Sequence, residues 1–451
     1  MENFFNLNSL VVGDEYRSYR KAIWLYVWLL VFEGALRKWI LPELSTPLLL
    51  VRDPIAIWLT WSGLQRGWIK TGYVKWMLLV SSLSLFFSIL IGHHNLFVGL
   101  YGWRIYFFHF PMIFVMAKVL TRDDFLKICR FFLIVSIPMT ILVVAQFYLP
   151  QTHWVNRGIG GDMTGIGFRG ALGYFRPPGT FSFTSGYVLF QGIVCSCLFF
   201  YMMKKNEIEE EYKFNNWIFL IIVGCFVVSI PTSISRTLVF IVVTSFFFLV
   251  FATIISRSEK KNIVYFILLV IVAIGAISYL GIANDATNAM NARFEEASKS
   301  EGGVIEGTII TRYFGSFERA FNSNFPITGY GIGLGTNVGA QIMAGNMYSF
   351  GFNGEEEWSR ILGECGLLGF FIIGVRVIFS LGVIKNSLRV LKETGDIVPW
   401  LFSAGVLLTI PNGQWAQPTE LGMAMMSGVL GLTALKIGQD NYLQYIENDE
   451  D

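Results

Sequence analysis

The chain has 451 residues, of which 54% are hydrophobic and only 15% are charged. Soluble globular proteins carry about 25% charged residues, so this sequence has too little polar surface to cover a water-soluble body of its size. The formal net charge of +2 provides no strong basic field, and we therefore expect no nucleic-acid partner. The five cysteines lack metal-site spacing and the four histidines are scattered, so the sequence predicts no metal site and no cofactor.

Apolar segments recur along the whole chain. A helix needs about 20 mostly apolar residues to cross a bilayer. The first apolar run follows a polar stretch that ends at Arg20 and shows no cleavage site, so we interpret it as a retained anchor. The sequence therefore predicts an all-α polytopic membrane protein, with a single integral membrane domain over residues 1–451. Its twelve predicted spans are 20–37, 48–63, 75–92, 100–119, 128–149, 183–203, 217–233, 236–256, 263–282, 358–383, 398–411 and 419–437.

Lysine and arginine are concentrated in alternate loops, which a twelve-span count places on one side of the membrane. By the positive-inside rule this side is cytoplasmic, with both termini on it. The residues concerned are Arg66, Lys70, Lys75, Lys118, Arg122, Lys127, Arg130, Lys204, Lys205, Lys213, Arg257, Lys260, Lys261, Lys385, Arg389 and Lys392. The opposite side carries two long segments, 150–182 and 283–357, the second between spans nine and ten. Long connections on one face predict that the protein works there.

Several charged residues fall within or beside the predicted spans. For Arg52 and Asp53 we favour a surface location, with Asp53 capping the helix that begins at Pro54. Arg104 and Arg236 each fit a snorkelling side chain when taken singly. As a group, however, the arginines at or beyond the outer ends of the spans oppose the positive-inside rule and favour an anion site, because guanidinium suits phosphate. This group is Arg104, Arg176, Arg236, Arg312 and Arg319.

The second long segment holds a glycine-rich stretch and an acidic one. Glycines 329, 331, 333 and 335 follow Pro326 and match neither a dinucleotide fingerprint nor a Walker loop. They form either a flexible loop or a backbone that closely approaches a ligand. Glu356, Arg360 and Glu364 are spaced to share one helix face. Asn353 and Glu356 fit a capping box, but a carboxylate here equally suits a general base for a sugar hydroxyl.

Three stretches resemble the O-antigen ligase and polymerase superfamily of bacterial surface-polysaccharide membrane proteins. "FRPPGTFSFTSGYVLF" at 175–190 is similar to the family's Arg-x-x-Gly-Thr-Phe segment, and "SISRTLVF" at 233–240 to its Ser-Arg motif. The third stretch runs from Arg312 through "FPITGYGIGLG" into "EEEWSRILGECGLLG". The family's His-Asn pair falls on Glu355 and Glu356. This absence of histidine counts against lipid A-core ligation and favours the polymerase branch or a divergent enzyme that uses glutamate.

The resemblance implies a GT-C-like glycosyltransferase in the bacterial inner membrane, with the two long segments in the periplasm. It would polymerise undecaprenyl diphosphate-linked oligosaccharide repeat units into a surface polysaccharide without a metal. Donor and acceptor are both lipid-linked glycans, and a chain-length regulator is a candidate partner. The implied catalytic residues are Glu355, Glu356 and Arg312, and the implied substrate-binding residues are Arg104, Arg176, Arg236, Arg319 and Arg360.

Two other functions remain open. One is a ligase that transfers the glycan to another acceptor. The other is a transporter or flippase for the lipid-linked glycan, which the charge of Glu33 within the first span and the short spans two and eleven would suit. The aromatic residues Tyr330, Trp358 and Trp415 fit either sugar stacking or anchoring at the membrane interface.

Overall fold

The computed structural model describes residues 16–256, 281, 283–301, 325–343 and 356–450, with further positions at 264, 267, 268, 270–272 and 275. Within this part of the chain every regular element is a helix, apart from an isolated antiparallel bridge between Arg169 and Phe175. The predicted all-α fold is confirmed.

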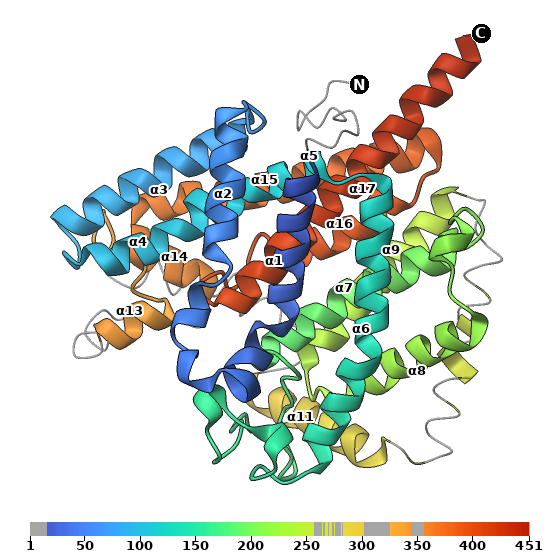
Figure 1. Cartoon of the computed structure of the whole chain (residues 1–451), viewed down its shortest axis with the longest axis horizontal. Coiled ribbons are helices and arrows are strands. Elements are labelled where there is room, and N and C mark those ends of the chain that lie inside the picture. The colour runs from blue at the N-terminus through green and yellow to red at the C-terminus, as the bar shows by residue number, and fades with distance from the viewer. Residues whose placement is uncertain are drawn as a thin grey trace.

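The helices follow one another with short connections, except across the two long segments (Figure 1). Two of them continue into π-helical turns, at Leu36–Ile40 and Ile105–His109. The α-helices are α1 (Arg17–Ala35), α2 (Asp53–Gln65), α3 (Gly72–Leu90), α4 (Leu96–Arg104), α5 (Phe110–Val119), α6 (Arg122–Tyr148), α7 (Thr184–Lys204), α8 (Asn216–Thr232), α9 (Arg236–Ser256), α11 (Asn284–Glu301), α13 (Asn337–Ile342), α14 (Glu357–Cys365), α15 (Leu367–Thr394), α16 (Val398–Thr409) and α17 (Pro418–Glu450).

Six of these helices are long and apolar enough to cross a membrane: α3, α6, α7, α9, α15 and the part of α17 up to Asp440. The apolar helices α8 and α16 are shorter, and both coincide with predicted spans. The ninth predicted span, 263–282, lies largely outside the described residues. The structure therefore has the architecture of a helical membrane protein, while the count of twelve spans and the GT-C-like arrangement stay predictions.

The tenth predicted span is divided by a backbone turn. Gly366 separates α14 from α15 and adopts a positive φ of 57°. A Cβ atom at Gly366 would lie 2.1 Å from the carbonyl oxygen of Ile327, so only glycine fits this close approach. Hydropathy alone does not register such a break, because the break depends on the close approach of Ile327 to Gly366.

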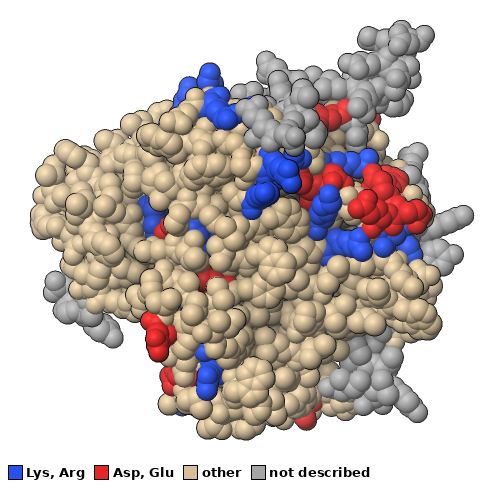
Figure 2. All heavy atoms as spheres, viewed as in Figure 1, with Lys and Arg blue, Asp and Glu red and all other residues tan. Residues whose placement is uncertain are grey.

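The described helix ends gather at two opposite ends of the bundle. At one end, Arg20 lies 3.9 Å from Asp124, and the Lys436 ammonium donates to the carbonyl of Leu120 over 2.6 Å. These contacts join the starts of α1 and α6 to α17 at the end that holds the predicted cytoplasmic loops, which we call the basic end. Figure 2 shows charged side chains gathered there above a broad surface on which charged residues are few.

The other end, which we call the loop end, collects the two long segments. There Arg52 donates to the carbonyl of Pro418, and the amide of Tyr330 donates to the carbonyl of Gly363. Helices α7 and α17 occupy the centre of the bundle, because 83% and 94% of their apolar windows are buried, against 33% for α3 and α9. Both central helices begin at the loop end.

Candidate functional site

A cavity of about 310 Å³ lies at the loop end, where α7 and α17 begin. Its polar lining consists of one guanidinium group, hydroxyl groups and three carboxamides, which suits an anionic or hydroxyl-rich ligand. The lining residues are Arg37, Leu49, Ile159, Ser182, Phe183, Asn337, Ala340, Gln341, Gln417, Pro418 and Thr419.

Arg37 reaches this cavity from the first π-helical turn. Its Nε donates to the carbonyl of Ser45 over 2.7 Å, and its Nη1 donates to the Ser182 hydroxyl over 2.8 Å. The same Nη1 lies 3.5 Å from a carboxylate oxygen of Glu33. Within the described residues Nη2 makes no hydrogen bond, so one edge of the guanidinium is available to a ligand.

Next to Arg37, Lys38 is 1% exposed. Its ammonium donates to the carbonyls of Gly179 and Phe181, at 3.1 Å and 2.5 Å, and within the described residues it has no carboxylate at ion-pair distance. Lys38 therefore holds the Gly-Thr-Phe turn, one of the segments that carry the family resemblance, against the end of α1. The adjacent Ser182 and Phe183 line the cavity.

Two buried ion pairs continue from Arg37 into the bundle. Glu33 lies 2.9 Å from Arg52, and Asp53 lies 2.6 Å from Arg104 and 2.9 Å from His109. Arg52 also donates to the carbonyl of Pro418 at the start of α17, over 2.7 Å.

We call Arg37, Lys38, Arg52, Arg104, Glu33 and Asp53 the cationic cluster. All six are at most 8% exposed. Four cations against two carboxylates leave a formal excess of two positive charges, with His109 counted as neutral. An uncompensated charge is costly to bury, so such residues usually face a partner or a cavity. The excess therefore favours an anionic partner at this site.

Unpaired polar atoms also concentrate around the cationic cluster. In native proteins most buried polar atoms are hydrogen-bonded, and exceptions require a reason. Here several buried atoms have no hydrogen-bond partner in the described part of the chain. They are Tyr26 Oη, Arg52 Nη1, Tyr101 Oη, Arg104 Nε and His109 Nδ1. Glu33 Oε1 also lacks a hydrogen bond, although it lies 3.5 Å from Arg37 Nη1. This cluster is thus built to hold further polar groups, as a binding site does.

The surface location predicted for Arg52 and Asp53 is wrong. They are 3% and 8% exposed, and no side chain caps α2. Arg104 does not snorkel either: it is 8% exposed, and its guanidinium carbon lies 4.0 Å from the centre of the Tyr101 ring. These side chains are buried because the packing of α1, α2 and α4 brings opposite charges together. Glu33 pairs with Arg52, and Asp53 pairs with Arg104.

The predicted acidic helix face is displaced by one residue. Glu357 carries two ion pairs: Arg360 lies 2.9 Å and Arg376 2.5 Å from its carboxylate. Glu364 also pairs with Arg360, over 2.7 Å. Glu356 is the N-cap residue of α14 and makes no capping hydrogen bond with its side chain. Asn353, the other residue of the predicted capping box, lies outside the described residues.

Arg360 is 0% exposed, and its guanidinium also donates to Tyr106. In this structure it ties α14 to the second π-helical turn. Trp415 is likewise 0% exposed and lies 3.7 Å from the Arg376 guanidinium carbon, so it neither stacks on sugars nor anchors at the interface.

Arg176 and Arg236 belong to a separate corner of the loop end. Gly170 packs against both Ile234 and Arg176, because a Cβ atom there would be 2.8 Å from Ile234 and 3.5 Å from Arg176. Ile234 precedes Arg236, the first residue of α9. The structure thus brings two of the motif segments together. Both arginines are half-buried and engaged in further interactions, and neither lines the cavity.

The other predicted catalytic and substrate-binding residues, Arg312, Arg319 and Glu355, lie outside the described residues. Sequence reasoning missed Arg37 and Lys38. The signal was present: both lie at the outer end of the first span, where the positive-inside rule disfavours them, as it does Arg104. Applying the rule to every lysine and arginine would have found them.

The glycine-rich stretch packs closely against other parts of the protein, while a close approach to a ligand stays a prediction. Gly333 has a φ of 96°, and a Cβ atom there would lie 2.2 Å from the carbonyl oxygen of Val98. Similarly, Gly329 packs against the backbone of Glu364 and Gly331 against His93. These contacts fasten the second long segment to α4 and α14, and so place α13 at the cavity.

Within the described residues no three His, Cys, Asp or Glu side chains gather in a metal-binding geometry. Comparison of the chain with models of protein families, with curated proteins and with solved structures found no match.

Proposed function

We propose that this protein is a membrane glycosyltransferase that polymerises undecaprenyl diphosphate-linked oligosaccharide units on the extracytoplasmic face. The observation that carries the proposal is the excess of two positive charges in the cationic cluster beside a polar cavity at the loop end. A lipid diphosphate is an anion that would reside at this membrane surface. Its two phosphate groups match an excess of two cations.

The transfer step requires a stabilised leaving group. The hydroxyl oxygen of the acceptor sugar attacks the anomeric carbon of the donor glycan. The bond from that carbon to the diphosphate oxygen breaks, and the lipid diphosphate leaves with the bonding electrons. Fixed cations stabilise the charge that develops on the leaving oxygen. In this proposal Arg37 Nη2 binds that group directly, and Arg52 and Arg104 maintain the positive field behind it.

The acceptor proton needs a base. Glu355 or Glu356 would take it, as the resemblance implies. The carboxamides of Asn337, Gln341 and Gln417 line the cavity and both donate and accept hydrogen bonds, which suits the hydroxyl groups of a glycan. Arg312 and Arg319, in the same long segment as Asn337, are proposed as further diphosphate contacts, with Arg176 and Arg236 as contacts for the glycan.

The first prediction tests the diphosphate site. Purified protein is incubated with lipid-linked repeat units from the producing cell, and product length is measured by gel electrophoresis. We expect wild-type protein to lengthen the lipid-linked chains. Arg37→Ala should lower the rate roughly a hundredfold or more, because a leaving-group contact is lost. Arg157→Ala is the matched control, since Arg157 lies in the loop after α6 but does not line the cavity.

The same assay separates the alternatives. Transfer to an acceptor without a lipid carrier would make the protein a ligase. Movement of lipid-linked glycan between leaflets without bond formation would make it a transporter. Equal polymer ladders from Arg37→Ala and Arg157→Ala would remove Arg37 from the site.

A further inference from the structure

Arg37 and Lys38 bind two consecutive residues of the turn 179–182, whose last residue lines the cavity. Arg37 Nη1 donates to the Ser182 hydroxyl over 2.8 Å, and the Lys38 ammonium donates to the Phe181 carbonyl over 2.5 Å. That carbonyl belongs to the same peptide group as the N–H of Ser182. The two side chains and the turn therefore form a closed loop of contacts, through which Lys38 positions both Ser182 and Arg37.

Neutral contacts also fix this turn, independently of Lys38. The Gln146 carboxamide accepts from the Gly179 amide over 2.8 Å and donates to the Gly179 carbonyl over 3.2 Å. The Thr180 hydroxyl donates to a backbone carbonyl of α1 over 2.6 Å. A Cβ atom at Gly34 would lie 2.3 Å from the Thr180 carbonyl oxygen, so the turn packs directly on α1. The turn thus has neutral anchors, and a buried charge is not required to hold it.

The charge of Lys38 depends on pH. Lys38 is buried and follows the first predicted span, 20–37. Burial and the neighbouring charge of Arg37 lower the pKa of the Lys38 ammonium to about 7. The ammonium therefore predominates below this pH and the neutral amine above it. An arginine could not make this change, because a guanidinium keeps its proton.

The charged groups around Lys38 do not compensate for its burial. Glu33, the carboxylate of α1 at this end, lies 3.5 Å from Arg37. Glu43, on the turn that follows, is exposed. The turn 179–182 carries no ionisable side chain. Within the described residues, therefore, no carboxylate holds the proton on Lys38. The elements in contact with its π-helical turn are α1, Pro42–Leu44 and Ile159–Gly161.

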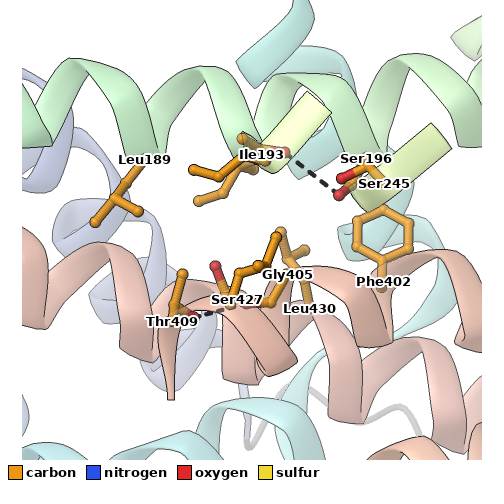
Figure 3. Close-up of a pocket in the computed structure, with 12 residues that line it drawn as sticks. Leu189, Ile193, Ser196, Ser245, Phe402, Gly405, Thr409, Ser427 and Leu430 are labelled. Atoms are coloured by element: carbon orange, nitrogen blue, oxygen red, sulfur yellow. Dashed lines mark hydrogen bonds between the residues drawn. The ribbon is translucent and has the colours of Figure 1, made fainter. Parts of the chain in front are cut away.

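The proton on Lys38 changes the charge that the cavity presents to a ligand. The cationic cluster has an excess of two positive charges when Lys38 is charged, and of one when it is neutral. Figure 3 shows a second pocket, between α7, α9, α16 and α17. This pocket offers no alternative site for an anion, because its volume of about 20 Å³ suits one water molecule and its described lining residues are uncharged. The change in charge therefore acts on the cavity beside Arg37.

We propose that Lys38 is a positioning residue whose proton sets the affinity of the cavity for an anion. The charged form strengthens the bond to the Phe181 carbonyl, because charge-assisted hydrogen bonds are the stronger kind. It also adds a positive charge behind Arg37 Nη2. The neutral amine retains two N–H donors for the two carbonyls of the turn but supplies neither effect. Anion binding should thus weaken as pH rises and Lys38 loses its proton. The inference rests on the proposed function only for the choice of a diphosphate as the anion.

The test measures the Kd of a soluble diphosphate diester, with one methyl group on each phosphate, for purified protein in nanodiscs at pH 6 and pH 9. This diester keeps the same two charges at both pH values, whereas a phosphate monoester has a second pKa of about 6. Lys38→Met removes the charge, and Lys38→Arg keeps it at both pH values. Lys436→Met is the matched control, because the Lys436 ammonium is also buried and also donates to backbone carbonyls, but at the basic end.

We expect wild-type protein to bind the diester roughly tenfold more tightly at pH 6 than at pH 9, because one unit charge near the anion is lost. Lys38→Met should bind weakly at both pH values, and Lys38→Arg should bind equally at both. Lys436→Met should follow the wild-type protein. The difference between wild type and Lys38→Met isolates Lys38, because all variants share the four histidines.

The same pH dependence in wild type and Lys38→Met would overturn the proposal and leave the diphosphate site in place. Lys38→Arg provides a second test if Lys38→Met fails to fold, since the wild-type pH dependence in that variant would overturn the proposal equally. An affinity of the wild-type protein that does not change between pH 6 and pH 9 would do the same. No binding by wild-type protein at either pH would overturn both this proposal and the diphosphate site on which the proposed function depends.

Discussion

At the scale of single residues, the buried charges at the loop end form two groups. The cationic cluster carries an excess of two positive charges beside the cavity. The second group consists of Glu357 and Glu364 with Arg360 and Arg376, and its formal charges balance. Arginine suits both groups, because its planar fork can bind several acceptors at once. The cationic cluster lies at the cavity. Arg360 and Arg376 instead form ion pairs with Glu357 and Glu364.

Glu357 should contribute strongly to stability. It is 2% exposed and pairs with both Arg360 and Arg376. Glu357→Gln leaves these buried cations with only Glu364, and breaking a buried pair costs about 3–5 kcal/mol. We expect a clearly lower Tm for this variant by thermal unfolding in detergent.

Glu420→Gln is the matched comparison. Glu420 is 7% exposed, but within the described residues it has no cation at ion-pair distance. Neutralising it removes a buried charge and breaks no ion pair, so Tm should not fall. A Glu357→Gln protein as stable as the Glu420→Gln protein would contradict the stabilising role of the ion pairs of Glu357 with Arg360 and Arg376.

At the scale of elements, two irregular helical turns shape the site. The π-helical turn Leu36–Ile40 holds Arg37 and Lys38, and the turn Ile105–His109 follows Arg104 and holds His109. Such turns add a residue to the helical repeat and are frequent at functional sites. Here they direct side chains of the cationic cluster away from the regular helix face. The apolar pattern of the sequence gives no sign of them.

The glycine-rich segment gives a prediction at this scale. Gly333→Ala would force a methyl group to within 2.2 Å of the Val98 carbonyl oxygen at a φ of 96°. We expect a loss of at least about 1–3 kcal/mol in stability, because the backbone cannot adopt this conformation without strain. Thermal unfolding and membrane yield measure it.

Gly224→Ala on α8 is the control for that substitution. Nothing lies within 4 Å of a Cβ there, and alanine is the better helix former by about 1 kcal/mol. Unchanged stability of the Gly333→Ala protein would show that the contact between the second long segment and α4 is dispensable.

At the scale of the whole molecule, the two ends of the bundle give a prediction of orientation. Thr164 is exposed in the long segment after α6, and Glu209 is exposed between α7 and α8 at the basic end. Because basic loops remain in the cytoplasm, Thr164→Cys should react with a membrane-impermeant maleimide in intact cells. Glu209→Cys should react only after permeabilisation.

The native cysteines should add little background in this labelling, since Cys129, Cys195, Cys197 and Cys365 are buried and Cys225 is half-buried. Labelling of Glu209→Cys alone in intact cells would reverse the orientation. It would also place the polar cavity on the cytoplasmic side, where the proposed polymerisation could not occur.

The sequence by itself determined the helical membrane architecture and the segregation of basic loops to one end, because both follow from local hydropathy and charge. It also indicated that cations gather at the loop end. Only the tertiary structure decided which cations form a cluster. Arg37, Arg52 and Arg104 come from different helices, and their placement depends on how α1, α2 and α4 pack. The division of the tenth span at Gly366 and the close packing of Gly333 were equally hidden, because both depend on contacts with distant backbone that no local pattern records.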